Sequence, residues 1–320
     1  MGKTVTVSKA GDGDFSTISK AAESVPPEND ITIKIHNGLY REKLFLKNRC
    51  IRLIGEDPHR TVISWNDGAY NQHADGRKTG TFRSYTLYLG GQRAGLSNLT
   101  VQNTAGDGET AGQAVAVYAD ADFTSMKNVR LVSRQDTLFL APLPSAPRIA
   151  GSFRGPGENS RRKANCNYLK NCYIEGDIDF IFGGAETAFC NCKLFSQCRG
   201  KECNGYVAAP CTPKNQPFGF LFYRCELISN CPQSSVYLAR PWRRYAMAVF
   251  LECSVGKHIA PEGWNLWGPG TGEEKTVRFA EFSNKGPGAN PKGRPDWVRQ
   301  LSRCQAERII SEIRKIAKTK

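Results

Sequence analysis

The sequence predicts an all-β fold, a right-handed parallel β-helix, and three observations lead to this prediction. A short segment that alternates apolar and polar residues occurs six times along the chain, and alternation is the period of a β-strand. Clusters of Gly, Asn, Asp and Pro separate the copies. No helical pattern of ten or more residues lies between them. Strands without crossover helices argue against a doubly wound sheet and favour a solenoid, whose coils bury their inward residues against one another.

The six copies of the repeat begin at Leu96, Met126, Leu169, Phe189, Phe222 and Phe250. They start 30, 43, 20, 33 and 28 residues apart, which is typical of coils with loops of variable length. The longest interval predicts one insertion over 141–168, a stretch rich in Pro, Gly and Arg. Four copies carry a cysteine at their fourth position, and we expect these thiols to form a buried inward column: Cys172, Cys192, Cys225 and Cys253.

Strands are also expected wherever the same alternation occurs, over 31–35, 51–54, 86–89 and 114–118. The ends of a solenoid need covers, because open strand edges template aggregation. A short helix over 15–25, with Ser16 as its N-cap, is expected to close the first coil. A long amphipathic helix over 296–318 is expected to pack across the outside of the coils. No linker divides the chain, so residues 1–320 are predicted to form a single domain.

The composition is that of a folded globular protein, with 40% apolar and 23% charged residues. No apolar stretch is long enough to span a membrane. The N-terminus lacks the apolar core of a signal peptide, so we expect a cytoplasmic protein if the chain is complete and an extracellular one if it is a trimmed mature form. The net charge of +14 favours a polyanionic partner, although charge alone does not choose which polyanion.

Twelve cysteines are compatible with disulfides or with free thiols. Their spacings do not form paired Cys-x-x-Cys knuckles, and the four histidines lie far from them in sequence, so no zinc site is expected. With no leader visible, free buried thiols are favoured over a disulfide framework.

Four polar and aromatic segments on predicted strands could carry chemistry, whereas the Gly-x-Ser-x-Gly and Gly-x-Gly-x-x-Gly motifs are absent. Successive coils would align Gln113, Asp136 and Asp179 in a column. Two carboxyl groups near an arginine can divide into an ionised nucleophile and a protonated general acid. Gln113 and Gln135 could donate hydrogen bonds to an oxyanion. Aromatic side chains could floor a groove for sugar rings: Phe139, Phe182 and Trp242.

Other interpretations of these residues remain open at this point. Asp and Gln in such coils commonly cap turns, and Arg240-Pro-Trp242 could only anchor a loop. Asp177 lies two residues from Asp179 and would share its face of a regular strand. On spacing alone, Asp177 is therefore a rival nucleophile.

The segments resemble, in order along the chain, the motifs of the pectin methylesterases (pectinesterases). The five matching segments are Gly38-Leu-Tyr40-Arg-Glu42, Gln113-Ala-Val-Ala-Val, Gln135-Asp136-Thr-Leu-Phe139, Asp179-Phe-Ile-Phe182-Gly-Gly-Ala and Leu238-Ala-Arg240-Pro-Trp242. The resemblance runs from about Val5 to Val298. In this chain, Gly184 and Ala239 replace the family's usual Asn and Gly. The insertion over 141–168 also places the two aspartates further apart than in the plant enzymes.

The resemblance implies a parallel β-helix that removes methyl esters from polygalacturonate without metal or organic cofactor. Asp179 would be the nucleophile and Asp136 the general acid, then base. The glutamines would stabilise the oxyanion and Arg240 would position Asp179. Trp242 would line the cleft, and Trp264 would provide a second aromatic subsite. Asp177 falls outside the family's catalytic set. A monomer without nucleic-acid or membrane partners is expected.

Two other function classes are compatible with part of the sequence pattern. A polysaccharide lyase or glycoside hydrolase on the same polymer would keep the fold, but a lyase should show a calcium-binding carboxylate cluster and no clear one is found. A basic solenoid that binds nucleic acid or acts as an adhesin would explain the charge. It would leave the five ordered motifs unexplained.

Overall fold

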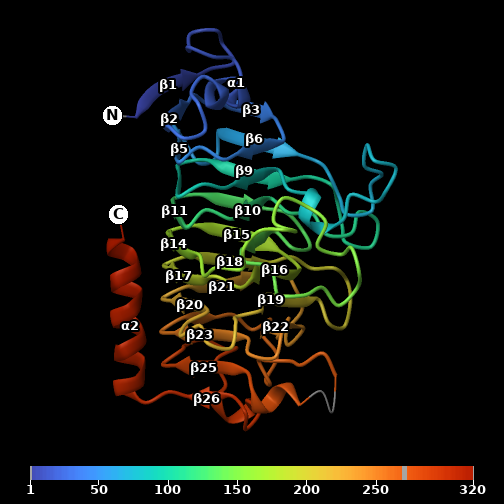
Figure 1. The fold of residues 1–320 in the computed structure, drawn as a ribbon. Coiled ribbons are helices and arrows are strands. Elements are labelled where there is room, and N and C mark those ends of the chain that lie inside the picture. The colour runs from blue at the N-terminus through green and yellow to red at the C-terminus, as the bar shows by residue number, and fades with distance from the viewer. Residues whose placement is uncertain (1, 269–271, 320) are drawn as a thin grey trace.

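In the computed structural model, which describes residues 2–268 and 272–319, parallel strands stack into a long solenoid (Figure 1). The described strands form three parallel sheets, here called A, B and C, with eleven, eight and seven strands. Neighbouring strands in each sheet come from successive coils. Each coil contributes to the three sheets in turn, which is the arrangement of a parallel β-helix. This confirms the predicted fold class.

Sheet A contains β1 (Lys3–Val7), β2 (Asp30–Ile35), β5 (Cys50–Gly55), β8 (Arg93–Ser97), β11 (Phe123–Lys127), β14 (Cys166–Lys170), β17 (Glu186–Cys190), β20 (Phe220–Tyr223), β23 (Met247–Leu251), β25 (Arg278–Phe282) and β26 (Arg299–Gln300). Sheet B contains β3 (Gly38–Arg41), β6 (Thr61–Trp65), β9 (Thr100–Asn103), β12 (Arg130–Val132), β15 (Tyr173–Gly176), β18 (Lys193–Ser196), β21 (Glu226–Ser229) and β24 (Ser254–Val255). Sheet C contains β4 (Leu44–Leu46), β7 (Leu87–Leu89), β10 (Val117–Ala119), β13 (Leu138–Leu140), β16 (Ile178–Gly183), β19 (Gly205–Pro210) and β22 (Val236–Ala239).

The six sequence repeats stack in register in sheet A. Their first residues pair directly on adjacent strands, from Leu96 through Met126, Leu169, Phe189 and Phe222 to Phe250. The third residue of each repeat has a left-handed backbone with φ between 52° and 55°. Asparagine fills this position in four of the six repeats, because its short polar side chain tolerates that conformation. Each repeat therefore spans the last two residues of a sheet A strand, the turn, and the first residues of the following sheet B strand, so the prediction that one repeat forms a single strand is wrong.

The cysteines at the fourth repeat position form the predicted buried column, with exposed fractions between 0% and 2%. Each thiol donates a weak hydrogen bond to the carbonyl of the first repeat residue in the preceding coil, as from Cys172 to Met126 and from Cys192 to Leu169. All twelve cysteines carry free thiols. The column acts as small, apolar core filling between coils.

The first coil is closed by α1 (Ile18–Glu23), which is shorter than the predicted helix over 15–25. The predicted N-cap, Ser16, is wrong, since Thr17 caps the helix. The carboxylate of Glu42 accepts hydrogen bonds from the backbone N–H groups of Ile18 and Ser19. A negative charge is favourable at a helix N-terminus. The early Gly-x-Tyr-x-Glu motif thus ties the cap to the first coil.

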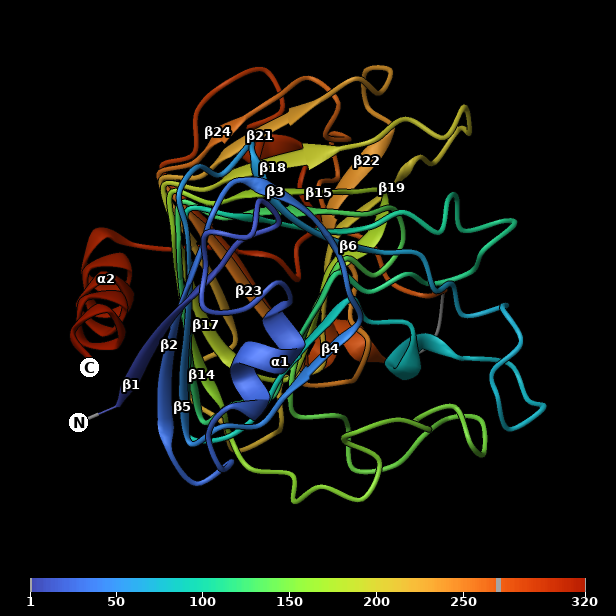
Figure 2. The ribbon, with the colours of Figure 1, turned by 90° about the horizontal axis from the view of Figure 1, so that it is seen from above.

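The C-terminal helix α2 (Arg303–Lys318) begins seven residues later than the predicted range over 296–318. Ser302 and Gln305 form a capping box that fixes this start. Before it, Arg299–Gln300 pair as β26 and Val298 enters the main core. The helix lies against the outer face of sheet A, as predicted (Figures 1 and 2). None of the described helices is long and apolar enough to cross a membrane.

Most predicted strands are present with shifted ends. The strand predicted over 114–118 is largely wrong, because β10 covers Val117–Ala119 and residues 114–116 are not part of a strand. Three short 3₁₀ helices also occur: η1 (Thr81–Arg83), η2 (Glu273–Lys275) and η3 (Pro291–Gly293). The predicted insertion is a loop between β13 and β14. It extends from the side of the solenoid that carries sheet C (Figure 2).

Candidate active site

A cleft of about 450 Å³ lies over the outer face of sheet C. Seven of the predicted site residues line it: Gln113, Gln135, Asp136, Asp179, Phe182, Arg240 and Trp242. The remaining lining residues are Thr81, Phe82, Arg148, Ile149, Ser152, Phe153, Ala209, Arg243 and Trp267. Residues separated by more than a hundred positions therefore share one cavity, which the stacking of coils makes possible.

Neighbouring coils supply the polar side chains of the cleft. Gln113 precedes β10, Gln135 and Asp136 precede β13, Asp179 lies in β16, and Arg240 follows β22. These strands belong to one run of sheet C. Backbone hydrogen bonds fix the positions of successive coils relative to one another. The N–H of Ala114 donates to the carbonyl of Gln135 (3.0 Å), and the N–H of Asp136 donates to the carbonyl of Ile178 (3.0 Å).

Both aspartates have unusual backbone conformations. Asp136 has φ of 65° and Asp179 has φ of 50°, a left-handed region that is unfavourable for most residues other than glycine. At Asp179, the pairing of β16 with β19 shifts register between Ile178 and Ile181. Such a bulge redirects a side chain from its regular position. The left-handed backbone and the bulge together direct the Asp179 carboxylate into the cleft.

Arg240 holds the Asp179 carboxylate at two points. Its Nε lies 2.9 Å from Oδ1 and its Nη2 lies 2.7 Å from Oδ2. The guanidinium is itself fixed between two aromatic rings, 4.0 Å from the centroid of Tyr206 and 3.8 Å from that of Trp267. A bidentate pair with a planar guanidinium fixes the orientation of the carboxylate.

Asp136 lies in a different electrostatic environment. Burial raises its pKa well above the usual range, and the negative charge of Asp179 raises it further. The charge of Arg240 acts in the opposite direction but does not reverse the shift. No side-chain ion pair to Asp136 is present among the described residues. One carboxyl group is thus paired with a cation, and its neighbour favours the protonated form.

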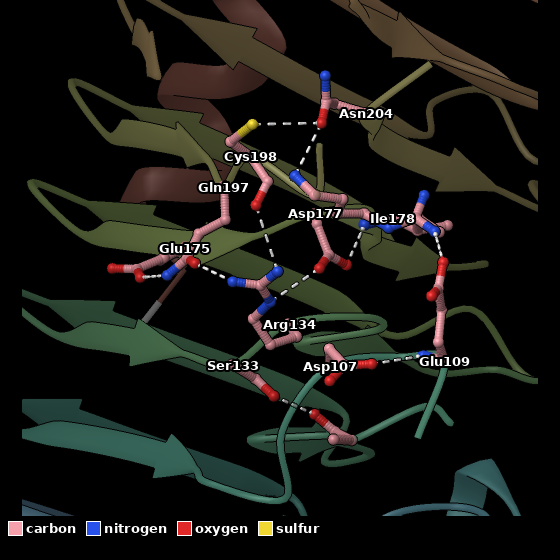
Figure 3. A network of polar contacts seen from close by, with 12 residues as sticks. Asp107, Glu109, Ser133, Arg134, Glu175, Asp177, Ile178, Gln197, Cys198 and Asn204 are labelled. Carbon is pink, nitrogen blue, oxygen red and sulfur yellow. Dashed lines mark hydrogen bonds and ion pairs between the residues drawn. The ribbon is translucent and has the colours of Figure 1, made fainter. Parts of the chain in front are cut away.

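Asp177, the rival nucleophile, lies outside the cleft. Its carboxylate accepts a hydrogen bond from Nε of Arg134 at 2.9 Å and one from the backbone N–H of Ile178 at 2.6 Å (Figure 3). The bulge at Asp179 breaks the two-residue alternation, so the two aspartates do not share a face. Asp177 instead belongs to a partly buried network that joins coils through Arg134, Gln197 and Glu175.

Two of the predicted aromatic contacts are wrong. Phe139 is fully buried, because the ring of Phe82 covers it at a centroid distance of 5.0 Å. Trp264 is 2% exposed, stacks on Phe279 and donates its indole N–H to Glu281 at 2.8 Å. Neither ring can face a sugar in the cleft.

Trp267 provides the exposed indole that the sequence analysis assigned to Trp264. It is 43% exposed, lines the cleft and donates its N–H to the carbonyl of Pro241. Two tryptophans occur close together in Trp264-Asn-Leu-Trp267, which signals an aromatic residue at the site. The spacing of the two tryptophans does not show which ring is buried. Phe82 and Arg243 were also missed. Arg243 directly follows Trp242, whereas Phe82 comes from a loop without a strand pattern.

The glycines after Phe182 are explained by close approach between coils. A Cβ atom at Gly183 would lie 2.0 Å from the carbonyl oxygen of Leu140, and its φ of 131° also favours glycine. A Cβ atom at Gly184 would lie 2.8 Å from the carbonyl oxygen of Pro142. Pro142 belongs to the start of the insertion. Its carbonyl lies so close to position 184 that a glycine fits there in place of the family's usual Asn.

The family model described as pectinesterase matches residues 4–143 and 159–311. The chain belongs to the pectinesterase family. Pectinesterase 31 of Arabidopsis thaliana is 30% identical over 317 residues, covering 96% of this chain and 90% of that relative. Pectinesterase QRT1 of the same plant is also 30% identical, covering 96% of this chain and 76% of the relative.

Solved structures of pectinesterases share the fold. The pectin methylesterase PemA from Erwinia chrysanthemi is 27% identical and superposes with a TM-score of 0.79, covering 98% of this chain and 97% of that one. The enzyme from carrot has a TM-score of 0.77 at 27% identity, covering 93% and 88%. A further pectin methylesterase, solved in complex with a hexasaccharide, has a TM-score of 0.77 with 98% and 97% coverage.

Among the described residues, no group of three or more His, Cys, Asp or Glu side chains is arranged to hold a metal ion. The polar side chains that line the cleft include two carboxyl groups, two carboxamides, three guanidinium groups and the hydroxyl groups of Thr81 and Ser152. This set can supply a nucleophile, a proton donor, oxyanion hydrogen bonds and anion binding. It is suited to acyl transfer on an acidic substrate.

Proposed function

We propose that this chain is a pectinesterase that hydrolyses methyl esters at the C6 carboxyl of galacturonate units in pectin or its oligomers and releases methanol. Membership of the family and the likeness to pectin methylesterases support the reaction. The observation that carries the assignment of residues is the unequal pair of aspartates. Arg240 binds the carboxylate of Asp179 at two points, while burial favours the protonated form of Asp136.

In the first step, a carboxylate oxygen of Asp179 attacks the ester carbonyl carbon. The carbonyl oxygen becomes an oxyanion, and the carboxamide N–H groups of Gln113 and Gln135, two residues that line the cleft, donate hydrogen bonds to it. The bond to the methoxy oxygen then breaks. Asp136 gives its proton to the departing methoxy oxygen, so that methanol leaves and an acyl-enzyme anhydride remains on Asp179.

In the second step, Asp136 is a carboxylate and takes a proton from water. The resulting hydroxide attacks the acyl carbon, and the bond to Asp179 breaks. The products are a free galacturonate acid, an ionised Asp179 and a protonated Asp136, which restores the starting state. Trp242 and Trp267 offer aromatic surface to the sugar rings, and the nearly buried ring of Phe182 packs against Trp242. All these groups come from one chain, and we propose that the enzyme acts as a monomer.

The test is methanol release from methyl-esterified polygalacturonate by Asp179→Asn and by the matched control Asp177→Asn. Both changes replace a buried carboxylate by an isosteric amide, and thermal unfolding reports whether each variant is folded. Asp179→Asn should abolish methanol release, whereas folded Asp177→Asn should keep it. Near wild-type release by folded Asp179→Asn would remove this residue from the mechanism. Unsaturated ends or new reducing ends without methanol would instead identify a lyase or a hydrolase.

A further inference from the structure

The helix α2 covers only part of the outer face of sheet A. The buried sheet residues under the helix belong to β17, β20, β23 and β25, whereas β2, β5 and β8 lie beyond its C-terminal end (Figure 1). A groove of about 650 Å³ occupies this uncovered area, and Thr319 at the end of α2 borders it. Sheet A and sheet C lie on different sides of the solenoid (Figure 2), and no residue lines both the groove and the cleft. The groove is therefore separate from the candidate active site.

Small residues lie between longer side chains in this groove. Gly95 on β8 and Ser125 on β11 pair directly on adjacent strands and both line the groove. A Cβ atom at Gly95 would lie 3.4 Å from Cγ of Arg52, so the stem of that arginine lies against this position. The Arg93 guanidinium lies 5.6 Å from the centroid of the Phe123 ring. The groove thus combines a floor of small residues with cationic side chains.

Three successive coils each supply one cation to the groove. Arg52 lies on β5, Arg93 on β8 and Lys127 on β11, and all three residues are exposed. Across the described residues 2–268 and 272–319, none of these side chains forms an ion pair or donates a hydrogen bond. The one carboxyl group among the described lining residues, that of Asp30, is paired with Arg49 at 2.8 Å. The groove therefore carries excess positive charge, and its donors are available to a ligand.

Two lysines extend this cationic surface along the sheet. Lys34 on β2 and Lys170 on β14 occupy the same register position as Lys127. Both are exposed, and neither has an ion-pair partner in the part of the chain that the structure describes. Equivalent positions on neighbouring strands lie about 4.8 Å apart, so these charges follow a line along the solenoid axis. A linear polyuronate carries one carboxylate per sugar unit, and its charges therefore also form a line.

We propose that the sheet A groove is a second, non-catalytic site that binds a de-esterified stretch of polygalacturonate. The choice of this polyanion rests on the proposed function, because ester hydrolysis in the cleft produces free galacturonate carboxylates on the same polymer. A polymer bound at the groove keeps its remaining esters near the cleft at a raised local concentration. The site also gives a role to part of the net charge of +14, which the residues of the cleft do not explain.

Binding of unmethylated polygalacturonate, measured by calorimetry at low salt, tests the site without turnover. The groove variant Arg52→Gln/Arg93→Gln/Lys127→Gln should bind this polymer about tenfold more weakly, which corresponds to about 1.4 kcal/mol, because three exposed ion pairs are lost. The difference should shrink at high salt. Thermal unfolding reports whether each variant is folded. A control variant, which should bind as wild type does, removes three exposed charges that line neither cavity: Lys257→Gln/Lys285→Gln/Lys292→Gln.

The same binding measurements separate this ligand from other polyanions. Duplex DNA and vesicles of anionic phospholipid serve as probes at the same salt concentration. Tighter binding of either probe than of polygalacturonate, lost in the groove variant alone, would assign the groove to a different partner. Equal weakening of polygalacturonate binding by the groove variant and the control would show that only net charge matters. Each of these results overturns the proposal, as does unchanged affinity in the groove variant.

Initial rates of methanol release then connect the groove with catalysis. On half-esterified pectin, the groove variant should raise KM about three- to fivefold and leave kcat unchanged. On fully methylated hexamers, which offer no free carboxylate to the groove, both parameters should equal those of wild type. A lowered kcat, or an equal loss on both substrates, would assign the three cations to the cleft or to the fold and overturns the proposal. Absence of methanol release by wild type would overturn the proposed function, whereas the binding measurements would still decide the groove.

Discussion

The guanidinium of Arg240 binds both carboxylate oxygens of Asp179 across 61 positions of sequence. The pair joins the loop after β22 to the bulged strand β16, two strands away in sheet C. Because Tyr206 and Trp267 hold the guanidinium from its faces, the geometry is fixed before a substrate arrives. Such preorganisation is a large source of catalytic power.

Replacement of Arg240 by lysine should therefore lower kcat although the positive charge remains. Lysine cannot reproduce the two parallel hydrogen bonds or the stacking between rings. Loss of one charge-assisted bond at about 1.5–3 kcal/mol predicts a decrease of roughly 10- to 100-fold. Steady-state methanol release checks the value. A Lys variant with wild-type kcat would show that charge alone suffices.

Asp136→Asn should abolish activity and increase stability at neutral pH. Burial raises the pKa of Asp136 in the folded protein, so the native state binds this proton more tightly than the unfolded chain does. The carboxyl group therefore destabilises the fold increasingly as pH rises above its unfolded pKa. Its removal should therefore raise the free energy of unfolding at pH 7.

Denaturant unfolding at two pH values checks the origin of this stabilisation. The advantage of Asp136→Asn over wild type should shrink toward pH 4, where the aspartate is increasingly protonated in both states. An advantage independent of pH would point to packing rather than to titration. In the wild type, kcat/KM should fall as pH rises through the elevated pKa of Asp136, because the general acid then loses its proton.

Substitution of Trp264 should affect mainly stability, and substitution of Trp267 should affect mainly activity. Trp264→Phe removes a buried hydrogen bond to Glu281 and should lower the free energy of unfolding by about 1–3 kcal/mol, with kcat/KM little changed. Trp267→Ala removes an exposed ring at the cleft. It should lower kcat/KM by about two- to thirteenfold, given about 0.5–1.5 kcal/mol for an aromatic contact, with a small change in Tm. The opposite pattern would reverse the assignment of the two rings.

The third residue of each repeat has a left-handed backbone, so a side chain branched at the β-carbon should destabilise the protein at this position. Asn191 is exposed and has φ of 52°, so its substitution changes little packing. Asn191→Val should destabilise the protein by about 1–2 kcal/mol, because a branched side chain disfavours this conformation. Asn191→Gly should be nearly neutral. Equal effects of Val and Gly in urea unfolding would show that backbone strain does not govern this turn.

The sequence by itself determined the solenoid. Its repeats alternate apolar and polar residues, carry asparagine at the left-handed turn in four of six copies, and recur at coil-length intervals, all of which are local properties. It also marked the two glutamines, Asp136, Asp179 and Arg240 as a set, because their motifs keep a family order. These features do not depend on how distant coils pack.

Only the tertiary structure decided which neighbouring residue faces the cleft. The bulge at Asp179 excludes Asp177, and burial separates Trp264 from Trp267, because both outcomes depend on the coil above or below. Phe139 follows a regular outward strand position and is still hidden, since Phe82 arrives from another loop. The local sequence decides which face of a strand a side chain points to. The residues that pack over that face decide whether the side chain is exposed.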